Sequence, residues 1–332
     1  MFSSEGGIER MMRLYLKALC ENAGPQESLD LIALNDPDIP VERRAAYADS
    51  HLRSATGMGG NRWRFTLRAI WCSFHCDRVI AGHFHLLPVL NLIRRFRPKL
   101  DLFIVAHGTE IWRPWSEKEQ GQARRGIKFL AVSRYTRNRI AQRCPGLREA
   151  QLHIVPNTID PSLPRAISPA VARERGLILS VARLCAEDNY KGIDHLIQAM
   201  PTILKECPFA RLRIVGRGND RTRLEDLARA HAPGKVEFAG FVPDADMPKE
   251  YSQAHLFALP SRDEGFGLVY LEAFSFGTPC IAVSAGAAEE LLTPETGRCT
   301  AYGDVSDLAA KVIDALGNFS TFCHNLRVPL ET

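Results

Sequence analysis

Short runs of β-forming residues alternate with longer helix-compatible segments along this chain, and the pattern occurs twice. In the first half we expect strands at 29–34, 78–81, 102–106, 129–132 and 152–155, with helices near 8–21, 61–75, 86–96 and 134–143. In the second half we expect strands at 177–181, 212–215, 236–238, 256–259 and 280–283, with helices near 194–206, 221–230, 246–253, 267–276 and 304–316. This alternation predicts parallel sheets covered by helices on both faces.

The two series of strands and helices predict two domains. Pro161, Pro164 and Pro169, with serines among them, indicate a linker, so we expect one domain at 1–165 and a second at 166–332. The 332 residues suffice for two hydrophobic cores. Ligands of such sheets bind outside the carboxyl ends of the strands, so a cleft between two facing domains is the expected place for a site.

Composition excludes several classes of protein. Apolar residues make up 45% and charged residues 24%, as in globular proteins. No apolar run is long enough to span a bilayer, and the first residues do not have the pattern of a signal peptide. The nine cysteines are scattered and odd in number, which favours a reducing cytosol over a disulfide framework.

The net charge of +4 is unevenly distributed. Residues 1–165 hold 25 Lys/Arg and 16 Asp/Glu, a net +9, whereas the remainder holds 17 and 22, a net −5. Two clusters, 62–68 and 94–99, mix arginines with aromatic residues, as helices at membrane surfaces do. An anionic membrane surface and an ordinary solvated basic face are both compatible with this pattern. No signature of a nucleic-acid-binding module is present.

Two carboxylates flank a glycine-bearing turn between a predicted strand and a predicted helix. Glu264 precedes Gly265-Phe266-Gly267-Leu268, and Glu272 lies in the second helical turn. Glycines allow backbone N–H groups to approach a ligand closely, and a helix N-terminus attracts phosphate. The pair is therefore suited to the two ends of a phosphorylated ligand, although such acids are also common on exposed surfaces.

Other residues at predicted strand ends suit the same kind of ligand. Arg183 and Lys191 follow a strand and can both contact a diphosphate. Gly216 begins a glycine turn where a base or ribose can pack, and Gly7 precedes the first helix. His107 follows a strand of the first half, where an imidazole can bind a sugar hydroxyl. Each of these residues, taken alone, is also compatible with a purely structural role.

We expect no metal site. Cys72, His75 and Cys76 are close in sequence, but a single C-x3-C without a second pair is a weak indication of a metal site. These residues also continue an apolar stripe of the predicted helix, so a packing role is the better interpretation.

Several motifs together resemble the retaining glycosyltransferases of family 4, whose GT-B architecture consists of two facing Rossmann-like domains. The resemblance runs along nearly the whole chain and is most specific at Glu264-x7-Glu272 combined with Arg183 and Lys191-Gly192. Further motifs are Gly6-Gly7-Ile8-Glu9-Arg10, His107-Gly108-Thr109-Glu110, 132–136 and 155–160. The chain departs from the family at its ends, where we expect neither the N-terminal strand nor the C-terminal crossover helix. We therefore expect an added N-terminal segment to raise soluble yield.

The resemblance implies a role for each candidate residue. Glu272 is expected to bind the ribose hydroxyls of a nucleotide-sugar, and Glu264 the hydroxyls of the donor sugar. Arg183 and Lys191 are expected to neutralise the diphosphate. His107 is expected near the donor sugar and the acceptor. The remaining expected donor contacts are Gly7, Gly216, Gly265, Phe266, Gly267 and Leu268.

The function that follows is transfer of a hexose-type sugar from a nucleotide-diphosphate-sugar to a glycan or lipid-linked acceptor. The resemblance implies retention of anomeric configuration, no metal and no cofactor, in polysaccharide or lipopolysaccharide biosynthesis at the cytoplasmic side of a membrane. Two alternatives stay open: a nucleotide-sugar epimerase of similar fold, and a truncated inactive glycosyltransferase that acts as a binding protein.

Overall fold

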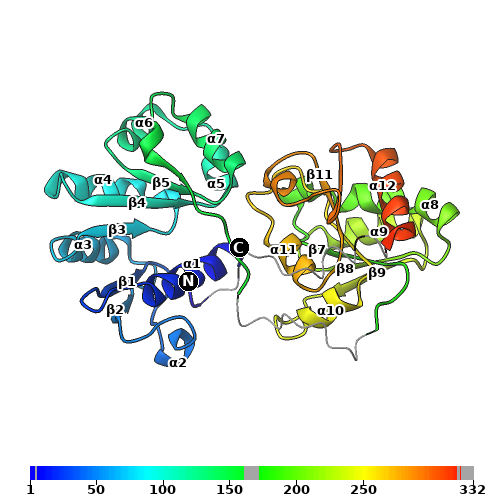
Figure 1. The fold of residues 1–332 in the computed structure, drawn as a ribbon, viewed down its shortest axis with the longest axis horizontal. Coiled ribbons are helices and arrows are strands. Elements are labelled where there is room, and N and C mark those ends of the chain that lie inside the picture. Colours follow the sequence, from blue (N-terminus) through cyan, green and yellow to red (C-terminus); the bar gives the residue numbers. More distant parts are fainter. Residues whose placement is uncertain (4–5, 161–171, 320–321, 323–332) are drawn as a thin grey trace. The chain divides into compact units, whose positions relative to one another are not determined.

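The chain forms two compact units, Met1–Thr158 and Ile159–Thr332, as the ribbon in Figure 1 shows. The structure is a computed structural model that describes residues 1–3, 6–160, 172–319 and 322. The division between the units falls a few residues before the boundary expected between 165 and 166. The expected linker around Pro161, Pro164 and Pro169 lies outside the described residues, as does most of the chain after 319.

The first unit contains two separate parallel sheets. One pairs β1 (Leu29–Ala33) with β2 (Leu52–Gly57), and the other has the order β3-β4-β5-β6. The strands of the second sheet are β3 (Arg78–Ala81), β4 (Asp101–Ala106), β5 (Lys128–Ala131) and β6 (Leu152–Ile154). The helices are α1 (Gly7–Glu21), α2 (Val41–Arg44), α3 (Arg62–Ser73), η1 (Phe84–Leu86), α4 (Leu87–Phe96), α5 (Thr109–Trp112), α6 (Glu117–Ala123), α7 (Arg134–Arg143) and η2 (Glu149–Gln151).

The described residues of the second unit form one parallel sheet with the order β12-β11-β10-β7-β8-β9. Its strands are β7 (Leu177–Val181), β8 (Arg211–Val215), β9 (Val236–Gly240), β10 (Leu256–Ala258), β11 (Cys280–Val283) and β12 (Gly297–Thr300). Its helices are η3 (Ala186–Lys191), α8 (Ile193–Glu206), α9 (Arg221–His231), α10 (Met247–Gln253), α11 (Leu268–Ser275), η4 (Ala287–Glu290) and α12 (Val305–Gly317). The strand order reverses direction between β7 and β10.

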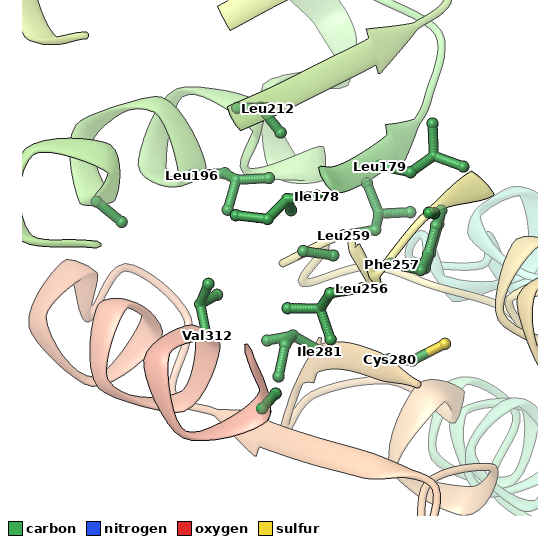
Figure 2. Packing of buried hydrophobic residues seen from close by; sticks show 14 of the residues in the cluster. Ile178, Leu179, Leu196, Leu212, Leu256, Phe257, Leu259, Cys280, Ile281 and Val312 are labelled. Carbon is green, nitrogen blue, oxygen red and sulfur yellow. The ribbon is translucent and has the colours of Figure 1, made fainter. Parts of the chain in front are cut away.

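One large apolar cluster holds the second unit together. Helix α8 packs against both α9 and α12, whereas α10 packs against α11. Figure 2 shows Leu196 of α8 and Val312 of α12 beside Ile178 and Ile281 of the sheet. All four side chains are fully buried. Burial of whole strands explains why their sequences are continuous apolar runs rather than alternating ones.

The expected α/β architecture with parallel sheets is confirmed, and nearly every expected strand and helix is present. Two strands were missed, β2 and β12, because Leu52–Gly57 and Gly297–Thr300 contain few β-branched or aromatic residues. Both become strands by pairing with a more apolar neighbour, β1 and β11 respectively. Among the described residues, α1 is the first element. The expected lack of a crossover helix concerns residues outside the described part of the chain.

Candidate functional site

The reversal between β7 and β10 brings two loops together at the carboxyl ends of these strands. The loop after β7 contains η3 and ends at Gly192, where α8 begins. The loop after β10 ends at Gly267, where α11 begins. A hydrogen bond from the Arg262 N–H to the Tyr190 carbonyl, 2.9 Å long, joins the two loops. Such a reversal is where open parallel sheets bind ligands.

Lys191 and Glu264 meet at this place. The ammonium nitrogen of Lys191 lies 2.8 Å from a carboxylate oxygen of Glu264, and the side chains are 19% and 16% exposed. Burial acts to lower the pKa of Lys191, but the charge and hydrogen bond of Glu264 raise it above its ordinary value. Lys191 is therefore a cation at neutral pH, held in place by Glu264.

Arg183 lies beside Lys191, and both residues line one small hollow with Asp188. The Arg183 guanidinium donates to the buried Asp188 carboxylate, with an Nη2–Oδ1 distance of 3.0 Å. The Arg183 side chain is nevertheless 69% exposed. Asp188 thus orients a cation whose outer edge faces solvent, and the sequence alone did not single out this aspartate.

The first turn of α11 has no side-chain cap. Its N-cap residue, Gly267, has φ of +88°, a conformation that favours glycine. A Cβ atom there would lie 2.4 Å from the Tyr270 ring. The neighbouring Phe266 is buried, and Leu268 is the first helical residue. The N-terminus of α11 thus lies directly after the loop that carries Glu264, where it favours an anion.

Glu272 lies in the second turn of α11, as the sequence predicts. It is buried and accepts a hydrogen bond from the Tyr251 hydroxyl at 2.7 Å. Tyr251 comes from α10 and stacks on Phe276, with ring centroids 6.0 Å apart. Tyr251 therefore fixes the orientation of the carboxylate. Sequence reasoning missed this tyrosine because its partner is 21 residues away.

Gly216 and Gly218 allow two loops to approach each other. A Cβ atom at Gly216 would lie 1.8 Å from the Ala182 carbonyl oxygen, and one at Gly218 would lie 2.0 Å from that of Leu184. The Leu184 N–H donates to the Arg217 carbonyl at 3.0 Å across this contact. The G-x-G motif thus has a structural role, in the same loop where the sequence predicts a contact with a base or ribose.

In the first unit, His107 lies at the carboxyl end of β4. Its Nε2 donates to the Gly82 carbonyl at 3.0 Å, and its backbone N–H donates to the Glu110 carboxylate at 2.7 Å. Burial lowers the pKa of His107, and the charges of Glu110 and Glu9 only partly oppose this effect. The imidazole is therefore neutral at neutral pH, with its proton on Nε2.

Gly7 is the first residue of α1 and is exposed. The same helix reaches the carboxyl end of β3, because a Cβ atom at Gly82 would lie 2.8 Å from the Met12 side chain. His107 and Met12 of α1 thus lie at neighbouring strand ends of the first unit. The other candidate residues all belong to the second unit.

The described part of the chain contains no group of three or more His, Cys, Asp or Glu side chains suited to a metal ion. Among the described residues, no helix is long and apolar enough to cross a membrane.

Comparisons with known proteins relate the chain to a large group of enzymes. The family model described as "Glycosyl transferases group 1" matches residues 175–318. A Corynebacterium glutamicum protein named GDP-mannose-dependent monoacylated alpha-(1-6)-phosphatidylinositol monomannoside mannosyltransferase is 39% identical over 133 residues, which cover 38% of this chain and 35% of that protein. A Mycolicibacterium smegmatis protein, GDP-mannose-dependent alpha-(1-6)-phosphatidylinositol monomannoside mannosyltransferase, is 34% identical over 56% of this chain and 52% of its own length.

Among solved structures, Anabaena Alr3699/HepE in complex with UDP matches with a TM-score of 0.75 at 20% identity. The match covers 97% of this chain and 90% of the Anabaena chain. This likeness spans both units and shows the fold. The matched segments span only about a third to a half of the length of the two curated relatives.

Proposed function

Because residues 175–318 match the family model of the group 1 glycosyl transferases and the chain has the GT-B fold, we propose that it transfers a hexose-type sugar from a nucleotide-diphosphate-sugar to a glycan or lipid-linked acceptor. The observation that carries the proposal is the Lys191–Glu264 pair at the strand reversal of the second unit. A partly buried cation, a carboxylate and a helix N-terminus meet there, and a nucleotide-sugar presents a partner for each of them.

The diphosphate binds to the cations of this site. Arg183 and Lys191 line the same hollow, and charge-assisted hydrogen bonds from these two side chains neutralise the two phosphates. N–H groups around Gly265, Gly267 and Leu268 complete the anion site at the start of α11. The cations and the helix dipole stabilise the leaving group without a metal or a cofactor.

The two glutamates bind hydroxyl groups. Glu272, oriented by Tyr251, accepts hydrogen bonds from the ribose diol. Glu264 binds hydroxyls of the donor sugar, and its pairing with Lys191 holds the carboxylate next to the phosphates. These residues position the donor and do not themselves transfer protons.

Within the first unit, the neutral His107 offers a hydrogen-bond acceptor. Its Nε2 proton is bound to the Gly82 carbonyl, so Nδ1 is left as an acceptor for a sugar hydroxyl. The transfer retains configuration. The bond between the anomeric carbon and the phosphate oxygen breaks, the acceptor oxygen bonds to the same face, and the acceptor proton moves to the leaving phosphate.

The names of the relatives suggest which substrates to test first. Two of them are GDP-mannose-dependent mannosyltransferases acting on a phosphatidylinositol mannoside, and the Anabaena structure contains UDP. We therefore propose GDP-mannose or a UDP-hexose as donor and a lipid-linked glycan as acceptor. The reaction belongs to polysaccharide or lipopolysaccharide biosynthesis on the cytoplasmic face of the membrane, where the enzyme is a peripheral protein.

The proposal is tested by nucleotide binding and by product analysis. Calorimetry of the full chain with GDP, UDP and their sugars identifies the donor. Lys191→Met is expected to weaken diphosphate binding by about ten- to a hundredfold, because a charge-assisted hydrogen bond contributes about 1.5–3 kcal/mol. Lys205→Met, an exposed substitution at the end of α8, is the matched control.

Two substitutions distinguish the roles of the two glutamates. Glu264→Gln is expected to weaken binding of the nucleotide-sugar more than binding of the nucleoside diphosphate, whereas Glu272→Gln is expected to weaken binding of both. A product with inverted configuration would refute retention, and loss of turnover in EDTA would refute metal independence. Epimerised donor without transfer favours the isomerase alternative. Donor binding without turnover on any acceptor favours the binding-protein alternative.

A further inference from the structure

The solvent-exposed side of α3 is apolar. Trp63 is 82% exposed, Leu67 66%, Trp71 55% and Phe74, the residue after the helix, 50%. In a typical surface helix, the apolar side faces the core and the polar side faces solvent. Single exposed apolar residues are common, but four in a row along one helix need an explanation.

The spacing places these four side chains in one line. Residues 63, 67, 71 and 74 are separated by four, four and three positions, so they share one face of a helix. The line is roughly 16 Å long at 1.5 Å per residue. Phe65 and Ser73, which lie away from this line on the helix, are buried. The fold therefore anchors α3 through one face and leaves the aromatic face exposed.

Helix α4 packs against α3 and presents similar residues. Leu92 and Phe96 are exposed on α4. The two helices are joined at their C-terminal ends, where the Arg97 guanidinium donates to the Ser73 carbonyl at 2.7 Å and lies 5.9 Å from the Phe74 ring centre. We name these residues the α3–α4 face: Trp63, Leu67, Trp71, Phe74, Leu92 and Phe96.

The α3–α4 face lies within a strongly basic segment. Residues 61–100 contain eight Lys/Arg and a single acid, Asp77, which gives a net charge of +7. Arg62, Arg64, Arg95 and Lys99 are exposed. None of these four forms an ion pair with another residue that the structure describes. Their charges are therefore available to an external partner.

Charge decides between the two partners that would cover such a face. A second copy of this chain would bring one segment of charge +7 against another, which is unfavourable. An anionic membrane attracts the arginines, and tryptophan is suited to the boundary between headgroups and acyl chains. The observations favour the membrane.

We propose that the α3–α4 face binds the surface of an anionic lipid bilayer. Trp63, Leu67 and Trp71 insert at the boundary between headgroups and acyl chains, and Arg62, Arg64 and Arg95 contact the lipid phosphates. The binding is peripheral and does not depend on the proposed sugar transfer, since none of these residues belongs to the donor site.

Vesicle binding by the full chain tests this surface. Co-sedimentation with phosphatidylglycerol–phosphatidylcholine vesicles is compared with phosphatidylcholine alone, at low and high salt. The Trp63→Ser/Leu67→Ser double variant is expected to bind at least about tenfold more weakly, and each of Arg64→Glu and Arg95→Glu at least about fivefold more weakly. Val41→Ser, which removes a 61% exposed apolar side chain from α2, is expected to bind normally.

Tryptophan fluorescence adds a direct readout. Trp63 and Trp71 are exposed, whereas Trp112 and Trp115 are buried, so a blue shift and quenching by brominated lipids on vesicle binding report on the α3–α4 face. All substituted side chains are exposed, and melting temperatures are expected to stay within a few degrees of the wild-type value.

Three outcomes would overturn the proposal. The first is a wild-type chain that does not bind anionic vesicles. The second is unchanged binding by Trp63→Ser/Leu67→Ser, or binding that is equally strong on phosphatidylcholine and at high salt. The third is a dimer, seen by analytical ultracentrifugation, that the double variant dissociates without any change in vesicle binding. This last result would assign the face to a second copy of the chain.

Discussion

Strands of the first unit are less buried than those of the second, although both units consist of parallel strands and helices. In the second unit, every residue of β10 and β11 is buried, and β7 is buried except at its last residue. In the first unit, β1, β2 and β3 contain a single buried residue or none. The strands are more buried in the unit whose sheet is continuous.

Within the described residues, the first unit has two sheets, so β1 and β3 are each bonded on one side only. The edge strand β9 of the second unit is also only partly buried. The β1–β2 sheet packs on a small cluster that includes Phe2, Leu16 and Ala33, separate from the core around β4 and β5. A parallel sheet thus gains its stability from neighbours on both sides and helices on both faces.

The largest expected difference in unfolding free energy comes from the same substitution, isoleucine to alanine, made in a strand of each unit. Ile281→Ala in β11 removes a fully buried side chain and is expected to lower the free energy of unfolding of the second unit by about 4 kcal/mol. Ile32→Ala in β1, which is only partly buried, is expected to cost about 1 kcal/mol. Pulse proteolysis in urea, with fragments of each unit followed by mass spectrometry, measures both values. Equal costs would contradict the comparison.

Two glycine substitutions compare backbone contacts in the same way. Gly216→Ala places a methyl group 1.8 Å from the Ala182 carbonyl oxygen and is expected to cost about 3 kcal/mol of unfolding free energy. Gly82→Ala meets only the flexible end of the Met12 side chain, at 2.8 Å, and is expected to cost less than about 1 kcal/mol. A tolerated Gly216→Ala, measured by the same proteolysis, would show that the β7 and β8 loops can separate.

Acid is expected to destabilise the second unit through His255. Burial, with repulsion from Arg173 and Arg175, lowers the pKa of His255 to about 4, and its Nδ1 accepts from the Gly176 N–H at 2.9 Å. The unfolded chain binds a proton near pH 6.5, so the free energy of unfolding falls by about 3 kcal/mol between about pH 6.5 and 4.

His255→Asn is the control for this pH effect, because the amide can accept the same hydrogen bond and does not titrate. Urea unfolding of both proteins at pH 7 and pH 4.5 measures the difference. An identical pH dependence of wild type and variant would rule out His255 as its source.

Hydrogen exchange gives the smallest contrast and requires no mutation. Amides of β1 and β2 are expected to exchange at least about a hundredfold faster than those of β7 and β10, a difference of about 2.7 kcal/mol in opening free energy. Mass spectrometry of peptic fragments measures the rates. Equal protection in both sheets would mean that the β1–β2 sheet opens only with the whole unit.

Much of the fold is predictable because central parallel strands are continuous apolar runs. Leu177–Val181 and Cys280–Val283 are strands in both the sequence analysis and the structure. The strand β2 was not predicted, because its polar sequence becomes a strand only through pairing with β1. The split of the first unit into two sheets is not visible in any local sequence either.

The candidate site divides in a similar way. Glu264, Glu272, Arg183 and Lys191 stand out because each follows a strand or a glycine turn at a recognisable spacing. Their partners do not stand out, because Asp188 and Tyr251 look like ordinary loop and helix residues. The contact between Lys191 and Glu264 spans 73 residues.

The sequence by itself determined the alternation of strands and helices, the identity of the candidate residues and the basic character of the first unit. These properties depend on local composition and short-range spacing, which a sequence displays directly. The tertiary structure alone decided that Lys191 pairs with Glu264, that Tyr251 orients Glu272, and that the apolar side of α3 is exposed. Strand order and helix packing bring distant residues together, and they determine which face of a helix remains in water.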